Sequence, residues 1–140
     1  MGGACLPLKQ TSAIPPSGFQ YNVRLMPSEP LVVEGRPGPR EAQYLVVAGG
    51  KLTWEGVLRF EQALQGSEAP TTIVDLTQVS LVDSAGLGAI VRAYVSHIRA
   101  GRRLVLVGVN QRVGMLLEMS GLNPVLTTFG SLEDAQAALP

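Results

Sequence analysis

The chain has 140 residues, with 11 Lys and Arg side chains against 11 Asp and Glu, one His and one Cys. This length suits one domain that buries about 70% of its extended surface, so its core needs no disulfide bonds or metal ions to stabilise it. With a formal charge of zero, the chain lacks the excess of basic residues that is expected of a protein that binds nucleic acid or an anionic membrane. A single Cys and a single His exclude an internal disulfide and a structural zinc site.

The N-terminal part of the chain differs from the rest. No apolar run approaches the roughly 20 residues that span a bilayer, and no apolar signal core opens the sequence. We therefore expect a cytoplasmic protein without direct membrane insertion. Proline fixes its own φ and restricts the preceding residue, so residues 1–30 are expected to form a largely irregular extension. Its prolines are Pro7, Pro15, Pro16, Pro27 and Pro30.

The first ordered segments predict a hairpin and a helix. The β-rich runs Leu31–Val33 and Gln43–Val47 flank a stretch rich in Gly and Pro. Thr53 is placed to cap a helix over Trp54–Gln65, and Trp54 is interpreted as a packing residue. The residues at helical spacing expected on the buried face are Val57, Leu58, Glu61 and Leu64.

A strand over Thr71–Leu76 and a helix over about Ser84–Ala100 follow. The helix carries apolar residues at i, i+3, i+4 and i+7, which is typical of a half-buried helix. His97 lies off this stripe and is expected to face solvent. The stripe consists of Leu87, Ile90, Val91, Tyr94, Val95 and Ile98.

The remaining segments complete an alternating order of strands and helices. Leu104–Val107 predicts a strand covered on both faces, and Asn110 is placed to cap a helix through Met119. Val125–Phe129 predicts a last strand, and Ser131 opens a last helix. Because parallel crossovers are right-handed and place helices on the sheet, this order predicts one α/β domain over residues 31–140. Its mixed, mostly parallel β-sheet would carry four packed helices.

No arrangement of residues supports catalysis. Ser84 follows a strand, but a nucleophile elbow requires Gly two residues earlier, where Val82 stands. The only His lies thirteen residues further along the same helix, about 20 Å away at 1.5 Å per residue, too far to act as a base. Gly86 and Gly88 lack the third glycine of a dinucleotide-binding motif. We expect a non-enzyme that needs no cofactor and no metal.

Two features of the sequence are compatible with a surface that binds another protein. Met115 and Met119 are interpreted first as core, although methionine also suits adaptable protein-binding surfaces. Between Ser84 and Leu117 the chain has five arginines and no acidic residue. These arginines form either a solvated face or a surface for an acidic partner.

Three segments resemble one known family. They read Val74-Asp75-Leu76 followed by Val82-Asp83-Ser84-Ala85-Gly86-Leu87-Gly88, then Leu104-Val105-Leu106-Val107-Gly108-Val109, then Leu117-Glu118-Met119-Ser120-Gly121-Leu122. This combination is similar to the STAS domain, the family of bacterial anti-sigma factor antagonists. The resemblance covers about Leu31 to Leu139.

The resemblance implies a phosphorylation-controlled binding switch. In such antagonists the unphosphorylated form binds an anti-sigma factor, which is also a serine kinase of the histidine-kinase-like ATPase type, and the sigma factor is released. The kinase then phosphorylates a Ser or Thr at the start of the helix after the third strand, and a PP2C-type phosphatase removes the phosphate. Ser84 occupies the matching position, with plain helix N-capping as the alternative role of its hydroxyl. Family members also occur as homodimers.

The resemblance also implies a set of partner-binding residues. These are Asp83, Ser84, Ala85, Gly86, Leu87 and Gly88 at the helix start, together with Gly50, Thr53 and Met115. The family carries a Gly-Glu-Leu/Ile-Asp pattern after its second strand, where this chain has Gly50-Lys51-Leu52-Thr53 and neither acid. A second interpretation therefore stays open: a non-phosphorylated STAS subunit that docks permanently on another protein, like the small cytoplasmic subunit of a lipid-exporting ABC transporter.

Overall fold

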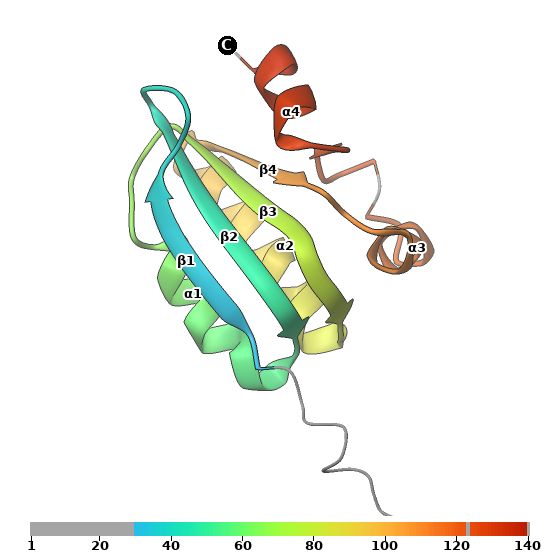
Figure 1. The fold of residues 1–140 in the computed structure, drawn as a ribbon. Coiled ribbons are helices and arrows are strands. Elements are labelled where there is room, and N and C mark those ends of the chain that lie inside the picture. The colour runs from blue at the N-terminus through green and yellow to red at the C-terminus, as the bar shows by residue number, and fades with distance from the viewer. Residues whose placement is uncertain (1–29, 123, 140) are drawn as a thin grey trace, which may run out of the picture.

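A five-stranded sheet with the order β1-β2-β3-β4-β5 forms the centre of the computed structural model, which describes residues 30–122 and 124–139 (Figure 1). β1 and β2 are antiparallel and the other neighbours are parallel, which confirms the predicted mixed, mostly parallel sheet. The expected irregular extension lies outside the described residues, apart from Pro30. The strands are β1 (Val32–Pro37), β2 (Gln43–Leu52), β3 (Thr71–Val82), β4 (Arg103–Val107) and β5 (Thr128–Phe129).

In the described part of the chain, three α-helices bury side chains in the main core cluster on one face of this sheet, and a fourth contacts the other face. The helical elements are the 3-10 turn η1 (Trp54–Gly56), α1 (Val57–Leu64), α2 (Ser84–Arg99), α3 (Gln111–Met119) and α4 (Leu132–Ala138). α1 and α2 lie together behind the sheet in Figure 1, and their Phe60 and Ile90 are buried with the main core cluster. Ala135 and Leu139, at the C-terminal end of the chain, belong to a second cluster with Ile73 of β3. Full burial of one such large apolar side chain stabilises the fold by about 1.5–3 kcal/mol.

Two central strands are longer than the sequence indicated. β2 continues through the glycine pair to Leu52, because a register shift beside Gly50, at φ +89°, lets pairing with β3 resume. β3 runs on to Val82, which pairs with Leu52. The two strands therefore end side by side, directly before η1 and α2. By contrast, the predicted last strand is reduced to Thr128–Phe129.

The buried face of α2 matches the predicted apolar stripe only in part: Ile90 is buried, and Leu87 and Tyr94 pack against the core. Val95 and Ile98 are 39% and 51% exposed, whereas His97 is only 4% exposed, so the expectation of a solvated His97 is wrong. Its Nδ1–H donates to the Ala93 carbonyl (2.8 Å), and its Nε2 accepts from the Thr72 hydroxyl (3.2 Å). A buried histidine with both ring nitrogens paired is structural, and hydrophobic periodicity cannot reveal such partners.

The start of the first helix also differs from the prediction. Trp54 is 71% exposed and Leu58 is 66% exposed, so the interpretations of both as buried residues are wrong. Phe60, at 1% exposure, takes the core position instead. The reason is the 3-10 turn η1, whose tighter winding changes the helical phase before α1 begins. Thr53 precedes η1 as predicted, but its side chain makes no capping hydrogen bond.

The other helix starts follow the sequence. The Asn110 side chain accepts a hydrogen bond from the Val113 N–H (2.8 Å), and the Ser131 hydroxyl accepts one from the Asp134 N–H (3.1 Å). Gly121, at φ +73°, follows the end of α3. Among the described residues, no helix has the length and apolar character needed to cross a bilayer.

Candidate functional site: the start of helix α2

Asp83 connects two helix starts at the end of the sheet. It is the N-cap residue of α2, and its Oδ1 accepts a hydrogen bond from the Gly86 N–H (2.8 Å). Its Oδ2 accepts a second bond from the Trp54 N–H (3.2 Å), at the start of η1. Each turn begins with N–H groups that lack partners in the turn itself. One carboxylate therefore fixes the loop after β2 to the start of α2.

Gly86 allows α2 to approach the end of β2. It is buried, and a Cβ at this position would stand 2.2 Å from the Leu52 carbonyl oxygen. Real Cβ atoms essentially never approach backbone oxygen so closely, so glycine is required here for packing within the chain. Gly88, by contrast, would place a Cβ 3.3 Å from the end of the flexible Arg92 side chain.

Ser84 lies in the first position of α2 with its side chain exposed. Because Asp83 fills the N-cap position, the Ser84 hydroxyl is not needed to cap the helix. It stands beside the positive end of the helix dipole, where an added phosphate would be favoured electrostatically. A kinase can reach a hydroxyl placed in this way.

The structure gathers most of the predicted partner-binding residues around this helix start. Ala85, Leu87 and Gly88 are half-buried on its first turns. Thr53 joins them because Asp83 holds the neighbouring Trp54 N–H. Gly50 lies further back along β2, where its carbonyl accepts a hydrogen bond from the Ser80 hydroxyl (3.3 Å).

Met115 borders the site from α3. It is 52% exposed and Met119 is 82% exposed, so their first interpretation as core residues is wrong. Together with Arg112 they line one side of a groove of about 890 Å³, and Ser80 and Val82 at the end of β3 line the other. The groove therefore reaches Val82, the residue directly before the N-cap Asp83. Flexible methionines on an open face are typical of a surface that binds another protein.

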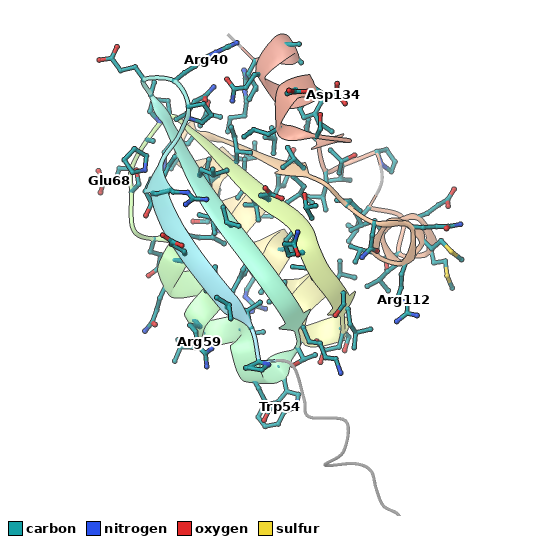
Figure 2. The ribbon with its side chains drawn as sticks, viewed as in Figure 1. Arg40, Trp54, Arg59, Glu68, Arg112 and Asp134 are labelled. Atoms are coloured by element: carbon teal, nitrogen blue, oxygen red, sulfur yellow. The ribbon has the colours of Figure 1, made fainter. Side chains whose placement is uncertain are left out.

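Trp54 is the residue of this site that sequence reasoning missed. Figure 2 shows its indole projecting away from the body of the protein, beside the start of α2. The sequence pattern predicted that Trp54 is buried in the first turn of a helix. In the structure, the 3-10 conformation of η1 and the hydrogen bond to Asp83 direct it outward. The one signal in the sequence was its place directly after Thr53, which the family resemblance implicated in partner binding.

The described residues offer this site no metal centre. No group of three or more His, Cys, Asp or Glu side chains in residues 30–122 and 124–139 is placed to hold an ion. What the geometry provides is an exposed hydroxyl, an exposed indole and a methionine-lined groove. This combination is typical of a protein-binding module on an α/β domain.

Comparison with known proteins places this module in a family. The family model described as STAS domain matches residues 41–135, and the chain therefore belongs to the STAS domain family. The anti-sigma-B factor antagonist of Listeria monocytogenes is 37% identical over 65 residues, which is 46% of this chain and 57% of the relative. The match thus spans little more than half of that relative. The anti-sigma-B factor antagonist of Staphylococcus aureus is 33% identical over 86 residues, covering 59% of this chain and 80% of the relative.

Solved structures agree on the fold. An anti-sigma factor antagonist from Mycobacterium paratuberculosis superposes with a TM-score of 0.67 at 18% identity, covering 77% of this chain and 92% of that one. A sulfate transporter family protein from Wolinella succinogenes gives a TM-score of 0.64 at 21% identity, covering 70% and 84%. At these identities the likeness is one of fold, and the fold serves both regulators and transporters.

Proposed function

We propose that this chain is an anti-sigma factor antagonist whose binding surface is controlled by phosphorylation of Ser84. The observation that carries the proposal is the exposed Ser84 hydroxyl at the start of α2, with helix capping already supplied by Asp83. The curated relatives named as anti-sigma-B factor antagonists support the regulatory class. The unphosphorylated form binds an anti-sigma factor that is also a serine kinase, and a PP2C-type phosphatase restores it.

Electrostatics explain how a phosphate releases the partner. A phosphoserine carries about −1.5 to −2 charges, and at residue 84 it stands directly beside the Asp83 carboxylate. The helix dipole and the N–H groups of the first turn favour the added charge, so the domain stays folded. In a complex, the same group would be a bulky, desolvated charge at the centre of the contact. The phosphate therefore acts against docking and not against the fold.

A second function is favoured by one specific observation. Lys51 and Thr53 stand where the resembling family carries acids, and the Thr53 side chain makes no capping bond. A chain without those acids suits a STAS subunit that docks permanently and is never phosphorylated. Both functions use the same surface and differ in whether Ser84 is modified.

The experiment that separates them uses purified proteins. Each anti-sigma factor of the source organism is purified, tested for binding to the full chain, and incubated with it and ATP. Mass spectrometry then locates any phosphate. We expect one anti-sigma factor to bind and one phosphate on Ser84. Binding without phosphate identifies the permanently docked subunit, and absence of binding across the set refutes the antagonist function.

Variants of the same helix test the switch itself. We expect Ser84→Ala to fold and bind like the wild type, and Ser84→Glu to bind at least tenfold more weakly, a loss of about 1.4 kcal/mol. Ser96→Glu is the matched control, because Ser96 is exposed on α2 twelve residues away, about 18 Å along the helix axis. Equal affinities of Ser84→Ala and Ser84→Glu would rule out a switch at this position.

A further inference from the structure

We propose that the Trp54 indole is the anchoring side chain of the docking surface, and that the surface receives an acidic face of the anti-sigma factor. This inference rests on the proposed function and adds to it a contact residue and the charge of the partner. It starts from two observations: a tryptophan that is 71% exposed, and the hydrogen bond that fixes its backbone beside Ser84.

The position of Trp54 is fixed and not incidental. Its N–H donates to Asp83 Oδ2, while the other oxygen of the same carboxylate holds α2. The loop that carries the indole is therefore held from two sides, by β2 before it and by α2 beside it. The backbone of Trp54 therefore loses little conformational freedom on binding.

Exposure of the indole is the feature that needs a partner. Tryptophan is among the residues that most often dominate the energetics of protein interfaces, because one side chain buries a large apolar area. Met115 and Met119 add adaptable apolar surface in the groove that reaches Val82, two residues before Ser84. The indole therefore adds a rigid apolar contact to a surface that already offers flexible ones.

Charge identifies the chemistry of the occupant. Lys51 follows Gly50 in β2, and Arg112 is exposed on the wall of the methionine-lined groove, as Figure 2 shows. Glu55 is exposed in η1, and the Asp83 carboxylate keeps its charge although both of its oxygens accept backbone N–H groups. An acidic partner face complements the two basic side chains. It also explains release, since a phosphate at Ser84 repels acidic groups and would attract basic ones.

The first test observes Trp54 directly. The chain contains one Trp, so incorporation of 5-fluorotryptophan yields a single ¹⁹F resonance that reports this residue alone. The labelled full chain is titrated with the anti-sigma factor that binds the wild type. We expect the resonance to shift on binding and its solvent-isotope effect to fall, as the indole leaves water. An unchanged resonance in a saturated complex overturns the inference and leaves the antagonist function intact.

The second test measures affinity. We expect Trp54→Ala to keep its melting temperature, because the side chain is exposed, and to bind at least tenfold more weakly. Ile98→Ala is the matched control: Ile98 is 51% exposed, but it lies in the last turn of α2, at the opposite end from Ser84. We expect its affinity to stay within twofold of the wild type. Affinity of Trp54→Ala within twofold of the wild type contradicts the anchoring role.

Two charge-reversal variants test whether the partner face is acidic. We expect Arg112→Glu to weaken binding at least fivefold, more at low than at high salt, because exposed charges are screened by ions. Arg99→Glu makes the same change in the last turn of α2 and should leave affinity within twofold. Equal affinities of the two variants contradict the acidic face. If no anti-sigma factor binds the wild type at all, the proposed function fails first and this inference fails with it.

Discussion

Replacement of Gly86 by Ala tests how α2 is seated against the sheet. The new Cβ would lie 2.2 Å from the Leu52 carbonyl oxygen and 2.9 Å from the Leu52 Cγ, whereas ordinary contacts begin near 3.4 Å. The backbone of α2 or of β2 must therefore move by about 1 Å. Overpacking of this kind costs about 1–3 kcal/mol.

Gly88→Ala is the matched control because it makes the same chemical change two residues later. Its Cβ would meet only the end of the Arg92 side chain at 3.3 Å, which can move away at little cost. Alanine is favoured over glycine in a helix by about 0.5–1 kcal/mol, and both variants share this gain. The difference between the two variants therefore isolates the cost of the contact with Leu52.

Thermal unfolding measures that difference. One kcal/mol shifts the melting temperature of a domain of about 110 residues by about 4 °C, so Gly86→Ala should melt at least about 4 °C below Gly88→Ala. We also expect Gly86→Ala to change the ¹⁹F resonance of Trp54, because Asp83 connects the two helix starts. Equal melting temperatures of the two alanine variants would refute the close packing of α2 on β2.

Two further predictions concern the buried face of α2. Ile90→Asp should unfold the domain, because Ile90 is 1% exposed and an unpaired charge would be buried, whereas Ile98→Asp should leave circular dichroism and melting nearly unchanged. If both variants melt like the wild type, the face is misassigned. Thr72→Val should cost about 1–3 kcal/mol by leaving the His97 Nε2 unpaired, and His97→Phe in the same chain should recover part of that loss in urea unfolding. Additive losses would mean that the two side chains do not interact.

The sequence alone determined the order of elements and the family. Strong local signals fixed these features: apolar runs for the strands, and Asn110 and Ser131 at helix starts, where each side chain caps as expected. The Asp83-Ser84 pair before a helix also marked the candidate site. Such signals depend on neighbours within a few residues, so they survive without knowledge of the fold.

Tertiary structure decided which faces are buried and how the site is assembled. His97 is buried because Thr72, which lies 25 residues earlier in the chain, supplies its partner, and no local pattern contains that pairing. Trp54 faces solvent because a 3-10 turn shifts the helix phase and Asp83, 29 residues later, binds its N–H. In both cases, a contact distant in sequence overrides local hydrophobicity. At His97 the reason is that an unsatisfied polar group at a buried position costs more free energy than the solvent preference of one side chain. At Trp54 the bond to Asp83 is exposed, and it acts by fixing the direction of the backbone.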